Sequence, residues 1–209
     1  MSGSSKKNTY KNLINGERDM SMKHGIARWF AIIAIASLTG CGTIGTLSKL
    51  ENGAGAEASR MWDRWIEGGG DIAVATTWER KVKAGVTIAD IEQSLKQVAA
   101  ERRMKEVGEL PLSQELATRT GKPQKFLKVY SYCNPETARR MVDFSPHMAA
   151  YLPCRITVVE KDDGLWLYTL NMDMMVKMGR KLPSPLKEEA WEVRQTIFTM
   201  MERASRGEF

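Results

Sequence analysis

The sequence predicts an α+β fold, in which a mainly antiparallel sheet has its helices packed on one face. The strongest observation is the stretch LPCRITVVEKDDGLWLYTLN at residues 152–171, where two apolar, β-branched and aromatic runs flank the turn Lys161-Asp162-Asp163-Gly164. This pattern is typical of a β-hairpin. The second observation is the order of the expected elements, β-α-β-(α)-β-α-β-β-α-α. The third is a composition of 43% apolar and 27% charged residues, as in an ordinary globular protein.

The first forty residues are predicted to be a targeting segment. Residues 29–38 form an uncharged, mostly apolar run behind a basic segment that contains Lys23 and Arg28. The run is too short for a transmembrane helix, which needs about 20 residues, and it suits the apolar core of a secretory signal.

The end of this run, Leu38-Thr39-Gly40-Cys41, resembles the lipobox of bacterial lipoproteins. The resemblance implies that residues 1–40 are a cleaved signal peptide. Cys41 would then begin the mature chain, with a diacylglyceryl group on its thiol and an acyl chain such as palmitate on its amino group. Gly42 stands where lipoproteins of the inner membrane usually have aspartate, which implies an outer-membrane protein facing the periplasm. The alternative is a signal anchor with an incidental cysteine.

The net charge of +6 gives little support for nucleic-acid binding. Six basic and two acidic residues precede Cys41, so about +2 remains on the rest of the chain, which is too little to argue for such a partner. With only His24 and His147, a zinc site built on three histidines is excluded. The sequence has no Gly-rich phosphate loop before a helix and no recognisable catalytic triad, so no cofactor and no catalytic residue is predicted.

Residues 41–70 are expected to be a tether followed by a short amphipathic helix. The tether is rich in Gly, Ser, Thr and Ala, and Gly68-Gly69-Gly70 ends the helix. The apolar stripe of this helix is expected to consist of Ala58, Met61, Trp62, Trp65 and Ile66. The helix either binds a membrane surface or partner, or packs on the folded domain. The mixed charges of its polar face favour packing.

The domain itself is expected at residues 71–180, beginning with a strand at 72–80. A helix follows from Thr87, because Asp90 occupies the capping-box position. Residues 104–110 then predict an edge strand that ends at a proline.

The second half of the chain continues this alternation. Residues 112–119 predict a helical turn and residues 126–133 a strand. Asn134, followed by a proline, is expected to cap the next helix. After the hairpin come a short helix at 172–178 and a long C-terminal helix within residues 181–209.

Three motifs in this order resemble the domain of unknown function 302 family. They are Tyr132-Cys133-Asn134-Pro135, then Leu152-Pro153-Cys154-Arg155-Ile156, then the hairpin end at Asn171. The resemblance implies a compact domain of TATA-binding-protein-like topology that forms a homodimer, without an established activity. The chain departs from the family pattern at Met172, where proline is common, which puts that helix start in doubt.

Cys133 and Cys154 are the first candidates for chemistry. In an oxidising compartment an even pair favours a disulfide. The alternatives are two unpaired buried thiols, or a reactive thiol site for redox or sulfur chemistry. For reactivity, Cys133 directly precedes a helix N-terminus, whose dipole would lower the thiol pKa.

Methionines near the hairpin are the second candidates. Met172, Met174, Met175 and Met178, with His147-Met148 upstream, could supply soft ligands for Cu(I). The alternative is that these methionines fill irregular core space, so no metal site is predicted.

Arg155 is the third candidate. If it lies near the Asn134 helix start, the two could bind an anion through the guanidinium and backbone amides. The alternative is that Arg155 pairs with Glu160 or Asp143 at the surface.

The sequence does not decide between a binding protein and an enzyme. The first hypothesis is a non-enzymatic, lipid-anchored periplasmic homodimer that binds a small ligand or a protein partner. The second is a thiol-dependent redox or sulfur-metabolism protein that uses Cys133 and Cys154. The third is a copper-binding lipoprotein that uses the methionine cluster.

Overall fold

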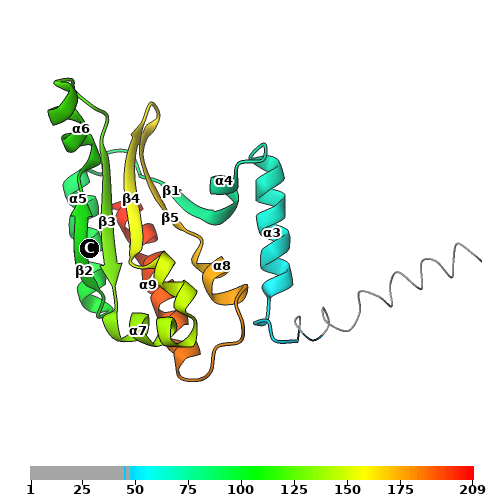
Figure 1. The fold of residues 1–209 in the computed structure, drawn as a ribbon. Helices are drawn as coiled ribbons and strands as arrows, with labels where there is room; N and C mark the ends of the chain where they lie inside the picture. Colours follow the sequence, from blue (N-terminus) through cyan, green and yellow to red (C-terminus); the bar gives the residue numbers. More distant parts are fainter. Residues whose placement is uncertain (1–44, 46–47) are drawn as a thin grey trace, which may run out of the picture. The chain divides into compact units, whose positions relative to one another are not determined.

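A five-stranded sheet in the order β1-β5-β4-β3-β2 organises the computed structural model, which describes residue 45 and residues 48–209 (Figure 1). Every neighbouring pair of strands is antiparallel, which confirms the predicted fold class. The strands are β1 (Thr77–Lys81), β2 (Lys105–Leu110), β3 (Leu127–Cys133), β4 (Cys154–Lys161) and β5 (Gly164–Leu170). The predicted signal peptide and Cys41 lie outside the described residues.

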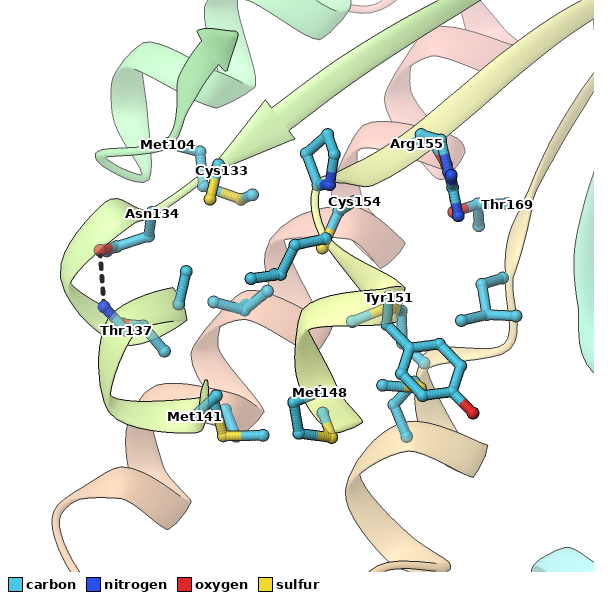
Figure 2. Close-up of a pocket in the computed structure, with 18 of the residues that line it drawn as sticks. Met104, Cys133, Asn134, Thr137, Met141, Met148, Tyr151, Cys154, Arg155 and Thr169 are labelled. Atoms are coloured by element: carbon cyan, nitrogen blue, oxygen red, sulfur yellow. Dashed lines mark hydrogen bonds between the residues drawn. The ribbon is translucent and has the colours of Figure 1, made fainter. Parts of the chain in front are cut away.

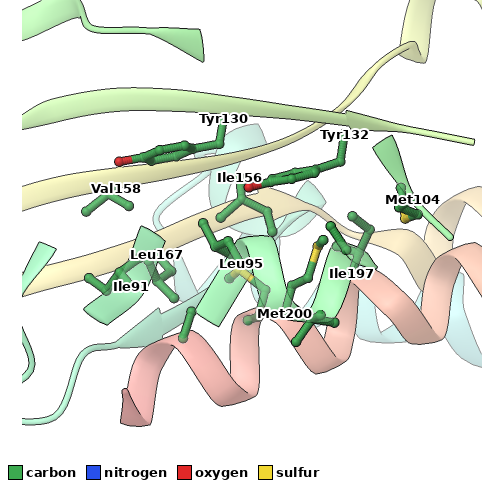
Figure 3. Close-up of a cluster of buried hydrophobic side chains, with 14 of the residues drawn as sticks. Ile91, Leu95, Met104, Tyr130, Tyr132, Ile156, Val158, Leu167, Ile197 and Met200 are labelled. Atoms are coloured by element: carbon green, nitrogen blue, oxygen red, sulfur yellow. The ribbon is translucent and has the colours of Figure 1, made fainter. Parts of the chain in front are cut away.

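Two long helices, α5 (Ile88–Glu101) and α9 (Leu186–Arg206), pack against each other and on one face of the sheet. The core lies between them and the sheet, where alternate residues of β3, Tyr130 and Tyr132, are fully buried (Figure 3). The side chains that pack around these tyrosines include Ile91, Leu95, Ile156, Val158, Leu167, Ile197 and Met200. The final helix, expected as a segment after the domain, therefore supplies part of its core.

Shorter helices surround this framework. They are α3 (Ala54–Glu67), α4 (Ile72–Thr76), α6 (Leu112–Thr120), α7 (Pro135–Phe144), the 3₁₀ helix η1 (Pro146–Tyr151) and α8 (Met172–Lys177). Across residue 45 and residues 48–209, no helix is both long and apolar enough to cross a membrane.

Side-chain caps fix where α5, α7 and α8 begin. Thr87 and Asp90 form the predicted capping box at the start of α5. The side chain of Asn134 accepts hydrogen bonds from two backbone amides of α7, as expected. Asn171 does the same for α8, so this helix starts in the predicted place although Met172 stands where proline is common.

The predicted strand at 72–80 is wrong in its first half. Asp71 accepts a 2.8 Å hydrogen bond from the backbone N of Ala73 and thereby caps α4, so the strand begins only at Thr77. The apolar, β-branched composition of this segment favours a strand, but the local cap stabilises a helical turn.

Helix α3 packs on α8 and α4 through a face that includes only part of the predicted stripe, because Met61 and Trp65 are half-buried and the other stripe residues are exposed. Ala54 and Glu57 are its buried residues, whereas Trp62 and Ile66 are 60% and 58% exposed. The buried carboxylate of Glu57 accepts a 2.8 Å hydrogen bond from the Asn171 amide and also pairs with Arg60. A polar contact therefore docks this helix, and apolar periodicity could not reveal it.

Replacing Asn171 with alanine is expected to destabilise the domain by about 2 kcal/mol, because the helix cap is lost and the Glu57 carboxylate loses a buried donor. Asn134→Ala is the matched control, because it removes a cap of the same type without a buried carboxylate partner, and we expect it to cost about 1 kcal/mol. Urea unfolding of the two variants measures the difference. Equal losses of unfolding free energy in the two variants would show that the contact between Glu57 and Asn171 contributes nothing to stability.

Candidate functional site

A cavity of about 360 Å³ lies where β3 ends and β4 begins (Figure 2). Residues from α7, η1, α8 and α9 complete its wall. The sequence builds this arrangement through the Asn134-Pro135 start of α7, which turns the chain away from β3, and through the η1 turn, which returns it to β4. The wall is mainly apolar, with the hydroxyls of Thr77, Tyr151, Thr157, Tyr168 and Thr169 among its polar groups.

Cys133 and Cys154 both line the cavity, and both are free thiols in the structure. Burial raises the pKa of the Cys133 thiol, so the lowered pKa expected from the α7 N-terminus is wrong. Burial, with a smaller contribution from Cys133, raises the pKa of Cys154 to about 11. Both groups are therefore protonated at neutral pH, and a protonated thiol is a poor nucleophile.

Methionines form a large part of the remaining wall. Over residue 45 and residues 48–209, the methionines that line the cavity are Met104, Met141, Met148, Met172 and Met175. Of the methionines considered as candidate Cu(I) ligands, Met148, Met172 and Met175 line the cavity, whereas Met174 and Met178 do not. Among the described residues, no group of three or more His, Cys, Asp or Glu side chains is placed to hold a metal ion.

Met104 and Met141 are among the cavity residues that the sequence analysis did not identify as site candidates. Met104 precedes β2, far along the chain from the hairpin, yet Figure 2 shows it beside Cys133 at one side of the cavity. No local pattern distinguishes such a residue from ordinary core. Only the pairing of β2 with β3 brings it to the site.

Arg155, on β4, is the only charged residue that lines the cavity among those the structure describes. The expected pairing with Glu160 or Asp143 is wrong, because the Glu160 carboxylate accepts from the backbone N of Phe126 and Asp143 pairs with Arg139. Over the described part of the chain, the Arg155 guanidinium forms no salt bridge.

Asn134 and Arg155 both line the cavity but do not form one anion site. Figure 2 shows Asn134 beside Cys133 at one side, and Arg155 with Thr169 and Tyr151 at the other. The Asn134 oxygen is already occupied by the amides of Glu136 and Thr137. Arg155 is therefore left as the candidate anion contact.

The fold and the cavity together define a compact α+β domain with one antiparallel sheet, two helices over one face and a ligand-sized pocket at the end of the central strands. The family model described as "Domain of unknown function DUF302" matches residues 78–204, and the chain belongs to this family. The matched region includes most of α9, beyond the end of the domain expected at residue 180.

A solved structure supports the same fold. The chain is similar to an uncharacterised conserved DUF302 protein from Bacillus stearothermophilus, with 16% sequence identity and a TM-score of 0.50. The similarity covers 62% of this chain and 98% of that chain. A comparison with curated proteins gives no match.

Proposed function

We propose that this protein is a non-enzymatic binding protein of the bacterial cell envelope. A lipid on Cys41 would hold it at the outer membrane, facing the periplasm, and its DUF302 domain binds a small, mainly apolar ligand. The observation that carries the binding proposal is the cavity of about 360 Å³ with its mainly apolar wall. Pockets for small ligands have volumes of about 300–1,000 Å³ and are lined in the same way.

The side chains of the wall support binding rather than reaction. The two thiols have raised pKa values, so neither is prepared as a nucleophile at neutral pH. Methionine side chains are flexible and polarisable, and they adapt to ligands of different shape. The thiol-dependent alternative gains no comparable support from the wall.

A homodimer is part of the proposal. The sheet face opposite α5 and α9 carries half-buried apolar side chains that a second copy would cover. They are Leu127, Val159 and Trp166, whereas Val129 and Tyr168 of the same face line the cavity. Light scattering of the purified protein gives its mass in solution directly.

Filling the cavity tests ligand binding. We expect decanol to raise the melting temperature of the full chain, because a ligand that binds only the folded state stabilises it. Ala138→Phe, on the α7 wall of the cavity, should reduce this shift at least severalfold. Ala149→Phe is the matched control, because Ala149 is exposed on η1 and does not line the cavity. Equal shifts in melting temperature for the two variants would show that decanol binds outside the cavity. If decanol does not shift the melting temperature of the parent, the proposal is overturned.

A further inference from the structure

The charge distribution of the cavity narrows the class of ligand. Among the residues that the structure describes, its wall combines thioethers, thiols, aliphatic side chains and neutral hydroxyls with one cation, Arg155, and contains no carboxylate. A neutral ligand would leave this cation unused, and a cationic ligand would be repelled by it.

The position of Arg155 allows it to meet a ligand. Its side chain is exposed while the residue lines the cavity, so it lies where the apolar interior meets water. The neighbouring backbone is fixed, because the Thr169 hydroxyl donates a 2.7 Å hydrogen bond to the Arg155 carbonyl. Within the described residues no carboxylate competes for the guanidinium, whereas Arg139 and Arg140 on α7 are both paired.

We propose that the ligand is an amphiphile with one anionic headgroup, in which the headgroup binds Arg155 and the apolar chain fills the cavity. This inference rests on the proposed binding function. A guanidinium can hold a carboxylate or a phosphate oxygen pair through two parallel N–H···O bonds.

The alkyl chain of the ligand contributes most of the affinity, and its headgroup contributes the selectivity between ligands. Each buried CH₂ group adds about 0.8 kcal/mol of transfer free energy, whichever headgroup follows it. The ion pair at an exposed guanidinium adds less binding free energy than the whole alkyl chain does, and its contribution falls as the ionic strength rises. A pair of ligands that share one chain and differ only in headgroup therefore isolates the role of Arg155.

Decanoate and decanol form such a pair, tested by melting-temperature titration of the full chain. We expect decanoate to bind about fivefold more tightly than decanol at low salt, a difference of about 1 kcal/mol. In Arg155→Met this preference should disappear while decanol binding stays unchanged. Arg102→Met, which removes an exposed arginine outside the cavity, should keep the preference. Decyl phosphate, titrated alongside, distinguishes a phosphate from a carboxylate headgroup.

The outcomes separate this inference from the function on which it rests. If decanol and decanoate bind equally, or if Arg155→Met weakens both alike, the headgroup inference is wrong and cavity binding stands. If neither compound shifts the melting temperature, both are overturned. Any partition into lipid or detergent is the same for all variants, so it cancels in the comparison.

Discussion

Cys41→Ser is expected to abolish lipid attachment completely. The lipobox resemblance places the diacylglyceryl group on the Cys41 thiol, and a serine hydroxyl cannot form that thioether. Because several acyl chains together hold a protein firmly at a bilayer, their loss should also remove this mode of membrane attachment. Incorporation of radiolabelled palmitate into the protein, resolved by electrophoresis, measures the effect directly.

The other two cysteines provide the controls. Cys133→Ser and Cys154→Ser change thiols of the cavity wall, so both variants should incorporate as much label as the parent. Label that persists in Cys41→Ser would contradict the lipobox interpretation, and a parent that incorporates no label would favour a signal anchor with an incidental cysteine.

Lys128→Met is expected to cost about 1–2 kcal/mol of folding free energy at neutral pH, between the values for exposed and for buried ion pairs, because the two carboxylate partners are partly exposed. The Lys128 ammonium is 15% exposed and lies 2.8 Å from a Glu92 oxygen and 2.7 Å from a Glu109 oxygen. Burial and the neighbouring Glu109 raise the pKa of Glu106, so a third carboxyl group belongs to the same cluster. Without the lysine, these groups would face one another without a cation between them.

The loss should depend on pH in a defined direction. Burial acts to raise the pKa of Glu92, but hydrogen bonds from Lys128 and Tyr130 outweigh it, and the net pKa is lowered. The hydrogen bond from Lys128 is the main cause of the lowered pKa of Glu109. A lowered carboxyl pKa stabilises the fold above the unfolded value of about 4.3, and this stability is lost as the pH falls through the folded value. The difference between parent and variant should therefore shrink below about pH 4.

Urea unfolding at pH 7 and pH 3.5 tests this prediction. Lys105→Met is the control, because Lys105 is exposed on the edge strand β2 and forms no salt bridge within the described residues. A loss in Lys128→Met that is the same at both pH values would show that the side chain contributes through packing alone.

Local signals predicted most of the fold because each is contained within a few residues. The hairpin follows from two apolar runs and one turn, and the starts of α5, α7 and α8 follow from capping residues. The same reasoning failed at α4, where one cap outweighs a strand-like composition, and it did not anticipate η1.

The candidate site was predictable only in part. Cys133, Cys154 and Arg155 stand in recognisable motifs, and the structure brings all three to one cavity. The cavity itself depends on how α7, η1 and α9 close around the sheet end, which involves residues far apart in sequence, Met104 and Met141 among them. The surroundings that raise the thiol pKa values depend on the same closure, so the helix dipole alone gave the wrong direction.

The contacts at the start of the described domain have a mechanical consequence. Leu50 forms a β-bridge with Arg180, and the Glu51 carboxylate accepts a 2.7 Å hydrogen bond from Lys187 at the start of α9. The backbone N of Glu51 donates to the Gly179 carbonyl. A pulling force that arrives through the preceding chain would load these contacts first, before α3 and the edge strand β1. The force would therefore enter the domain near the start of α9, its longest helix. It would not separate the strands of the sheet one by one from the edge strand β1.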